Sequence, residues 1–506
     1  MPDPSSSHDV EAIEPNKIKA PGPDLSSATI STSDTKDENA LTETLIAGEA
    51  KYNRLPWHQL TLMLIVEAIA LGSLSIPSAF ATLGMIAGVI CCVGVGLIAI
   101  YTSYMIGQVK LANPSVHHYG DAGTLMMGRF GYELFTIMFL LQLIFVIGSH
   151  CLTGSIALVH ITTSGICSLV FGIVSAVILF LLAVPSSFAD AATLGYIDFA
   201  SVIIAIEIAI ISTGTQATNA PGGLAAVSWS ALPKENLTFS ETYVAIGNIV
   251  FAYSFATCQF SFMDEMHTPR EFTKSILSLG ILEIAIYTIT GATIYAFVGL
   301  DVQSPALLSA DNTVSRVAFG IALPVIFISG SINTIVAGRL ILSRAFKNSV
   351  VRYVNTAKGW AVWLMLISCV TIVAWVLAEA IPFFNDLIGN TSALFTSGFS
   401  FYIPPIMWFV LIRKGKWYSK ENILLAAINA FVFIFGVAVL VCGLYSTIED
   451  IVSTPSHLLF YSKGDSLTEI YSAKNITKAV LDALSVALRL SRGTKNNQRN
   501  TYLDSW

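Results

Sequence analysis

The chain has 506 residues, of which 54% are hydrophobic and only 12% are charged, whereas about a quarter of the residues in an average soluble domain are charged. Such a low charge content cannot cover a long chain with groups that favour water, so the composition predicts a polytopic membrane protein embedded in a lipid bilayer. The formal net charge of −6 is spread over loops and tails, which excludes the basic stripe of a nucleic-acid-binding protein.

The first segment of the chain, residues 1–54, is rich in Ser, Asp, Glu, Thr and Pro. It has too few large apolar groups to offset the entropy lost on ordering, so we expect a disordered cytoplasmic N-terminal tail. A transmembrane domain is expected over residues 55–447, and residues 448–506 form a C-terminal tail.

Apolar runs long enough to cross about 30 Å of hydrocarbon recur along the transmembrane domain. Eleven are found, over residues 58–84, 86–107, 132–157, 168–188, 196–216, 243–266, 276–299, 316–342, 359–382, 391–412 and 422–447. They predict an all-α polytopic fold. With the N-terminus cytoplasmic, the outer loops contain only Lys234 and Arg316 as basic residues, which agrees with the positive-inside rule.

The first apolar run contains the sequence ALGSLSIPSAF over residues 70–80. Pro77 removes a backbone donor and clashes with the preceding turn, so we expect a kink or an unwound segment at residues 72–76. Freed backbone groups are tolerated in the membrane only where they face protein or a water-filled cavity. The alternative is a proline-kinked helix packed by small residues.

A second polar interruption occurs in the sixth run, which contains NIVFAYSFATCQFSFMDEM over residues 248–266. Because the second interruption occurs five helices after the first, a second five-helix unit would enter the membrane from the opposite side. Paired broken helices in two inverted halves indicate a transporter site near the bilayer midplane. The second interruption contains no Gly or Pro, so its unwinding is predicted from polar residues alone.

The longest predicted loop, residues 217–242, contains the sequon formed by Asn236, Leu237 and Thr238. A sequon is a glycosylation acceptor only on the lumenal or extracellular side, which agrees with the orientation given above. We expect the plasma membrane as the location, with the vacuolar membrane as the alternative.

Two runs resemble signatures of the amino acid/auxin permease family. GSLSIPSAFATLG resembles its first-helix signature, and the end of the sixth run resembles its E-M-x-x-P-x-x-F motif through Glu265, Met266, Pro269 and Phe272. The resemblance covers residues 55–447 and is closest to the fungal neutral amino acid permeases. It implies the five-plus-five inverted-repeat fold of the amino acid–polyamine–organocation superfamily with helices 1 and 6 broken, and proton-coupled uptake in many members.

An amino acid carries an ammonium and a carboxylate group, and dehydrating them unpaired would cost many kcal/mol. Free backbone groups at broken helices offer partners without a charged side chain. The family pattern implies that Gly72, Ser73, Leu74 and Ser75 surround the carboxylate and that the carbonyl groups of Ser254, Phe255 and Ala256 lie near the ammonium. Further candidates for substrate binding, each with packing as the alternative role, are Gln142, Phe145, Thr257 and Ser329.

Ionisable residues within apolar spans are costly and mark pathways. Glu67, Glu207 and Glu283 are candidates for proton coupling, with a structural hydrogen bond as the alternative for each. A sodium site is the competing scheme, built from first-helix carbonyls and the oxygen-bearing side chains of residues 329, 331, 333 and 334. We expect H⁺ as the driving ion, and the sequence does not exclude Na⁺.

The segment after the sixth run is densely charged. Asp264, Glu265 and Arg270 are candidates for an inner gate with Arg339, whereas the alternative is ordinary punctuation after a helix. The sequence contains no nucleotide-binding loop and no H-E-x-x-H motif, so we expect no enzyme activity, no cofactor and no metal. The sequence therefore predicts a secondary active transporter for neutral L-amino acids that works by alternating access. A non-transporting amino acid sensor is the runner-up, and the oligomeric state is left open.

Overall fold

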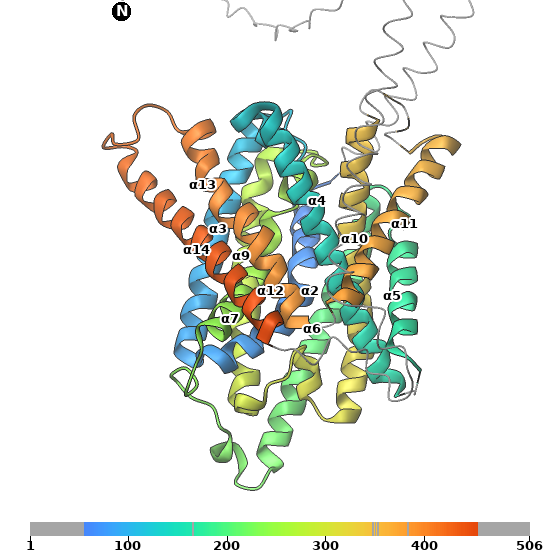
Figure 1. Ribbon diagram of the computed structural model, residues 1–506, viewed down its shortest axis with the longest axis vertical. Coiled ribbons are helices and arrows are strands. Elements are labelled where there is room, and N and C mark those ends of the chain that lie inside the picture. Colours follow the sequence, from blue (N-terminus) through green and yellow to red (C-terminus); the bar gives the residue numbers. More distant parts are fainter. Residues whose placement is uncertain are drawn as a thin grey trace, which may run out of the picture. The chain divides into compact units, whose positions relative to one another are not determined.

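The computed structural model describes residues 55–453, except residues 164–165, 347–348, 350, 352–353 and 382–383 (Figure 1). The predicted tails, residues 1–54 and the chain beyond residue 453, lie outside the described residues. Within the described part the fold is all-helical and contains no β-strand, apart from one isolated bridge between Leu55 and Met266. The predicted all-α fold class is therefore confirmed.

The first half of the bundle contains long helices that match the early apolar runs. They are α2 (Trp57–Leu83), α3 (Met85–Ala112), α4 (Tyr119–Thr162), α5 (Ser168–Leu182) and α6 (Phe188–Asn219). The short helix η1 (Gly223–Ala226) follows in the loop. α4 has a kink at Gly128, whose φ of 64° and ψ of −145° are not helical.

The second half contains the interrupted sixth span and the remaining long helices. They are α7 (Phe239–Ala252), η2 (Ser254–Ala256), α8 (Gln259–Met263), η3 (Pro269–Glu271), α9 (Phe272–Val298), η4 (Gly299–Asp301), η5 (Ala306–Ser309), α10 (Asn312–Ala345), α11 (Ala357–Ala380), α12 (Phe384–Thr391), η7 (Ser392–Tyr402), α13 (Ile403–Met407), η8 (Trp408–Ile412) and α14 (Ile423–Ser453). Both η7 and η8 are π-helical, and π-helical segments are often found at functional sites.

Nine helices of the described residues are long and apolar enough to cross a membrane, and α5 is a shorter apolar helix. Each of the eleven predicted ranges overlaps a helical stretch. The range 243–266 corresponds to α7, η2 and α8, and the range 391–412 corresponds to the end of α12 with η7, α13 and η8. These two composite spans contain 3₁₀-helical or π-helical segments in place of one continuous α-helix.

The predicted unwinding of the first span is wrong for this structure, because α2 is helical from Trp57 to Leu83 with Pro77 inside it, as in the alternative of a continuous helix that contains a proline. Side-chain hydroxyl groups bond back to the helix around the proline. The Ser75 hydroxyl donates to the Gly72 carbonyl at 3.0 Å, and the Ser78 hydroxyl donates to the Ser75 carbonyl at 2.7 Å. Such bonds and close neighbouring helices accommodate a proline in a transmembrane helix without unwinding it.

The predicted interruption in the sixth span is present. α7 ends at Ala252, Tyr253 has non-helical angles of φ −98° and ψ 37°, and α8 begins only at Gln259. Between them η2 forms one short 3₁₀ turn. The polar run at residues 253–258 was therefore a sufficient signal for a break without Gly or Pro.

The interrupted span lies beside the most deeply buried helix. In its most apolar window α2 is 94% buried, whereas the corresponding window of α14 is 28% buried, so α2 is the core helix and α14 a peripheral one. α2 lies in the interior of the bundle in Figure 1 and packs against α7, α9 and α6, while α10 packs mainly against α4 and α6. The segment η2 also contacts α2, which places the interruption in the core.

Candidate functional site

The interruption between α7 and α8 is flanked by two tyrosine hydroxyl groups. Tyr287 on α9 donates to the Ala252 carbonyl at 3.1 Å, and the Tyr119 hydroxyl lies 3.2 Å from the Ala256 carbonyl oxygen. The Tyr119 hydroxyl also lies 2.8 Å from the carbonyl oxygen of Phe399 in η7. The tyrosines thus supply partners for carbonyl groups on both sides of the interruption, where the regular helix supplies none.

The predicted carboxylate-binding residues Gly72, Ser73, Leu74 and Ser75 are all buried on α2. A side chain at Gly72 would place its Cβ 2.9 Å from Ala252 Cα and 2.9 Å from the Tyr287 hydroxyl. Gly72 therefore allows α2 to approach the end of α7 closely.

The continuity of α2 changes what this segment offers to a ligand. The backbone N–H groups of residues 72–75 are engaged within the helix. Pro77 has no N–H to donate to the Ser73 carbonyl, so α2 presents a hydrogen-bond acceptor here. The physical basis for a carboxylate at residues 72–75 is absent in this conformation.

Gln142 and Thr257, both predicted for the substrate site, are in contact. The Gln142 side-chain amide donates to Thr257 Oγ1 at 3.2 Å and to Thr396 Oγ1 at 3.2 Å. Gln142 Oε1 is buried and has no hydrogen-bond partner. Phe145, one turn along α4, is half-buried and stacks edge-on against Phe395 with ring centroids 5.4 Å apart.

The π-helical segment η7 joins this site, although the sequence did not predict it there. It supplies Thr396 to Gln142, Phe395 to Phe145 and the Phe399 carbonyl to Tyr119. The spacing of apolar residues in the tenth predicted span indicated a membrane helix, but it carried no signal that distinguishes a π-helix from an α-helix.

Two of the predicted coupling residues are buried close to the interruption. Glu67 on α2 hydrogen-bonds Cys258, and Glu67 Oε2 has no partner. Both carboxyl oxygens of Glu283 on α9 are buried without a hydrogen-bond partner.

The third predicted coupling residue, Glu207, is exposed on the outer face of α6. The burial on which its coupling role depended is therefore absent. A different acidic residue of α6, Asp198, is 1% exposed and was not predicted as a functional residue. Its position within a long apolar run was a signal that could have identified it.

Ser329, predicted for the substrate site, lies instead in the group around Asp198. Its hydroxyl oxygen is 2.7 Å from the Val66 carbonyl oxygen and 2.9 Å from Asp198 Oδ2. The neighbouring Ser331 donates to the Ile328 carbonyl of its own helix at 2.7 Å.

In the part of the chain that the structure describes, no group of three or more His, Cys, Asp or Glu residues could hold a metal ion.

At the end of the bundle where α8 terminates, Glu265 forms an ion pair with Arg339 of α10. Glu265 is 1% exposed, and its Oε2 accepts the Phe188 backbone N–H at 3.2 Å. The Arg339 guanidinium stacks over the Phe188 ring at 4.6 Å. Arg270, also predicted for the gate, is exposed.

Asp264, the fourth predicted gate residue, connects the same end to α3 and its following loop. Its Oδ1 lies 2.8 Å from Lys110 Nζ and 2.8 Å from His117 Nδ1. Burial alone would raise the pKa of Asp264, but the hydrogen bond from His117 and the charge of Lys110 hold this pKa well below its usual range. Leu55 also bonds this segment, through its N–H to the Glu265 carbonyl at 2.8 Å.

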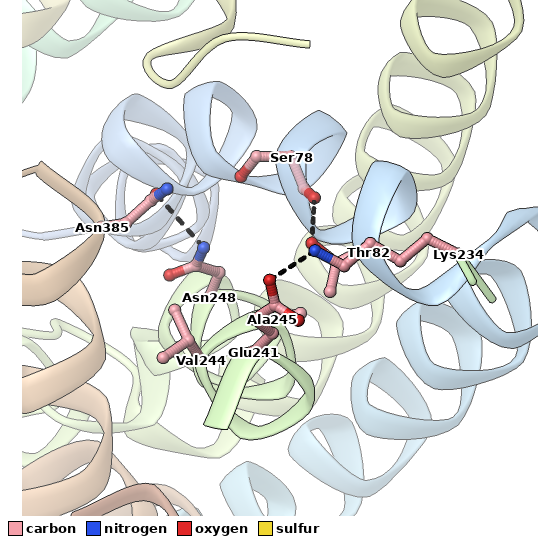
Figure 2. A pocket seen from close by; sticks show the side chains of 8 residues that line it. All are labelled: Ser78, Thr82, Lys234, Glu241, Val244, Ala245, Asn248 and Asn385. Atoms are coloured by element: carbon pink, nitrogen blue, oxygen red, sulfur yellow. Dashed lines mark hydrogen bonds and ion pairs between the residues drawn. The ribbon is translucent and has the colours of Figure 1, made fainter. Parts of the chain in front are cut away.

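The opposite end of α2 and α7 contains a pocket of about 180 Å³. Figure 2 shows its lining, which comes from the last turns of α2, from α7, from the loop before α7 and from the start of α12: Ser78, Thr82, Glu241, Val244, Ala245, Asn248, Lys234 and Asn385. Lys234 forms an ion pair with Glu241, and Asn248 donates to Asn385 Oδ1 at 3.3 Å. Asn248 Oδ1 is buried without a partner. The pocket therefore presents both charges and free amide groups above the interruption.

Comparison with solved structures finds the same fold in Mhp1, a nucleobase-cation-symport-1 family transporter in a closed conformation with bromovinylhydantoin bound. The TM-score is 0.51 at 12% sequence identity, and the match covers 82% of this chain and 96% of that chain.

Sequence comparison identifies relatives over the whole bundle. The chain is 58% identical to the N amino acid transport system protein of Neurospora crassa over 412 residues, which cover 81% of this chain and 88% of that protein. It is 22% identical to amino acid permease 2 of Arabidopsis thaliana over 71% of this chain and 80% of that protein. The family model described as transmembrane amino acid transporter protein matches residues 53–449. The chain therefore belongs to the transmembrane amino acid transporter family.

Proposed function

We propose that this protein is a secondary active transporter that moves neutral L-amino acids across a membrane by alternating access, driven by protons. The observation that carries the proposal is the interrupted sixth span, which places non-helical backbone at residues 253–258 against the buried core helix α2. Non-helical backbone at membrane depth is characteristic of the substrate sites of secondary transporters.

The chemistry around the interruption suits a zwitterion with an uncharged side chain. Carbonyl groups of Ser73 and of residues 254–256 would accept hydrogen bonds from the ammonium group. The amide of Gln142 and the hydroxyl of Thr257, which bond each other at 3.2 Å, would turn to the carboxylate. The phenyl groups of Phe145 and Phe255 provide apolar surroundings, which favour a neutral side chain.

The two ends of the bundle support alternating access. At one end the Glu265–Arg339 ion pair and the contacts of Asp264 join neighbouring segments and would act as the closed gate. At the other end the pocket between α2 and α7 lies open above the interruption. We assign the closed end to the cytoplasm, which gives an outward-facing conformation with the candidate binding residues buried.

Proton coupling is supported by Glu67 and Glu283, which bring carboxyl groups into the core without a cationic partner among the described residues. Glu67 bonds Cys258 within the interruption. A change in its protonation would therefore act on the side chain of Cys258, two residues after the carbonyl groups assigned to the ammonium group.

The decisive experiment uses purified protein in liposomes and measures uptake of labelled neutral amino acids under an imposed proton gradient or an imposed sodium gradient. We expect amino acid to accumulate under the proton gradient. When sodium replaces choline outside the liposomes at constant pH, we expect no accumulation. Accumulation that follows sodium would contradict proton coupling. Binding of amino acid without any uptake would indicate a non-transporting sensor instead of a transporter.

We propose that residues 55–447 form the transporter domain, with a cytoplasmic N-terminal tail, in the plasma membrane. Asn236 lies exposed in the loop before α7, at the same end as the pocket. A glycosidase-sensitive change in mobility that disappears in Asn236→Gln would support this orientation. An unmodified Asn236 would argue against this orientation, and a fluorescent tag on the vacuolar membrane would favour the vacuolar alternative.

A further inference from the structure

The Ser329 hydroxyl group is placed between two hydrogen-bond acceptors. Its oxygen lies 2.7 Å from the Val66 carbonyl oxygen and 2.9 Å from Asp198 Oδ2. A serine hydroxyl has a single proton to donate, so it can donate to only one of these two oxygens. The carbonyl of Val66 has no proton, so both short contacts can be hydrogen bonds only if Asp198 is the donor in one of them.

The surroundings of Asp198 favour the neutral acid on independent grounds. The side chain is 1% exposed, and Oδ1 has no hydrogen-bond partner. Among the described residues no lysine or arginine forms an ion pair with it, and burying an unpaired carboxylate costs several kcal/mol.

The helices packed against α6 contribute further titratable groups. They are Glu67 on α2 and Glu283 on α9, both buried acids, together with the Cys258 thiol that bonds Glu67. The charged groups of α9 and α10 nearer the helix ends are Lys274, Arg316, Arg339 and Arg344. Among the described residues these groups include no cation that forms an ion pair with Asp198, so burial of the unpaired group favours its neutral form.

We infer that Asp198 holds the coupling proton in this conformation and that this proton decides whether Ser329 bonds α2. In the protonated state Asp198 Oδ2–H donates to Ser329 Oγ, and Ser329 donates its own proton to the Val66 carbonyl. The chain of bonds then ties α6 and α10 to α2. When Asp198 releases its proton to water, its carboxylate accepts a hydrogen bond from the Ser329 hydroxyl. The Val66 carbonyl then loses its hydrogen bond from Ser329.

The inference rests on the proposed proton-coupled transport and gives it a mechanical link to the substrate site. Val66 precedes Glu67, which bonds Cys258 in the interruption. On the other side, Asn333 donates to the Ser329 carbonyl at 3.1 Å and contacts Cys258 through a 3.9 Å hydrogen bond from sulfur. Freeing α2 from Ser329 would therefore reach Cys258, within the interruption, through both of these routes.

The transport test is Asp198→Asn, whose amide can donate permanently to Ser329 and so imitates the protonated acid. We expect the variant to bind amino acid and to exchange labelled for unlabelled amino acid, while its accumulation ratio under a proton gradient falls to about 1 because coupling is lost. Glu207→Gln, on the exposed face of the same helix, is the matched control and should accumulate like the unmodified protein.

Variants of Ser329 test the relay separately. Ser329→Ala should lose accumulation, and Ser329→Thr, which keeps a hydroxyl, should restore much of it. Ser331→Ala removes a hydroxyl that serves only its own helix and should change little. Full pH-driven accumulation by both Asp198→Asn and Ser329→Ala would overturn the inference.

A spectroscopic test separates the inference from the proposed function. Isotope-edited infrared spectra of the purified protein at neutral pH should contain the carbonyl stretch of a neutral aspartic acid that is missing in Asp198→Asn. Absence of this band from the unmodified protein would overturn the proton assignment even if uptake is proton-driven. Its presence in a protein without pH-driven uptake would support the proton on Asp198 and reject the proposed coupling.

Discussion

The first and sixth spans differ in a way that their sequences do not suggest. α2 contains Gly72 and Pro77 and is continuous, whereas the sixth span contains neither residue type between Ala252 and Gln259 and is interrupted. In α2, serine hydroxyls bond back to carbonyls of the same helix. In the sixth span, Tyr119 and Tyr287 reach from other helices to carbonyls at the break. A membrane helix thus breaks where neighbouring helices supply partners for the freed backbone, and proline alone does not decide it.

The largest effect is expected from Glu265→Gln, which removes the anchor of the interrupted span at its closed end. Losing one partner of a buried ion pair costs about 3 kcal/mol, so the protein should shift towards a conformation open at this end. Labelling of a cysteine introduced near Arg339 should become faster. Glu271→Gln, which breaks the exposed pair with Lys274, is the control, and equal labelling in both variants would argue against a gate.

A smaller effect is expected from Gly72→Val, which tests the close contact between the continuous and the interrupted helix. The new side chain would meet Ala252 and the Tyr287 hydroxyl at 2.9 Å, and such overpacking costs about 1–3 kcal/mol. Uptake should be lost while the folded protein is still recovered. Gly94→Val, at a position with nothing within 4 Å, should transport normally, and normal uptake by Gly72→Val would show that α2 and α7 need not touch.

Tyr119→Phe tests the partner that the break receives from α4. It leaves the buried carbonyls of Ala256 and Phe399 without the tyrosine hydroxyl, at a cost of about 1–2 kcal/mol. We expect weaker amino acid binding, measured by the concentration dependence of uptake. The exposed Tyr104 provides the control Tyr104→Phe, and identical behaviour of the two variants would remove the tyrosine from the site.

The Asp264 contacts predict a specific pH dependence at the closed end. Because the pKa of Asp264 is below its usual range, its contribution to stability is complete above the unfolded-state pKa of about 4 and declines only as the pH falls towards the lower folded-state pKa. The difference in thermal stability between the unmodified protein and Asp264→Asn should therefore not shrink between pH 7 and pH 5. A difference that shrinks across this interval would contradict the assignment.

The smallest effect is expected from Pro77→Ala. α2 already accommodates the proline, and the substitution adds an N–H that can donate to the Ser73 carbonyl. Stability should change by less than about 1 kcal/mol, and uptake should stay within a few-fold of the unmodified protein. A collapse of uptake would show that α2 must open at Pro77 during transport, which would make the two spans alike after all.

The sequence was sufficient for the fold class, the apolar ranges and the interruption at residues 253–258, because apolar runs and polar breaks are local signals. The continuity of α2 depends on hydroxyl bonds and on α7 and α9 beside it, so it is a tertiary property. For a similar reason, the sequence indicated Glu207 as a coupling residue and did not indicate Asp198. Both faces of α6 are largely apolar, so periodicity could not tell which carboxyl group points inwards.

The central claim is that a neutral amino acid binds at the interruption between α7 and α8, against α2. The most direct test is an experimental structure determined with a transported neutral amino acid bound. We expect ligand density within hydrogen-bond distance of the backbone at residues 254–256 and of Gln142 or Thr257, with α8 still separate from α7. Density elsewhere, or a continuous helix through residues 253–258, would contradict it.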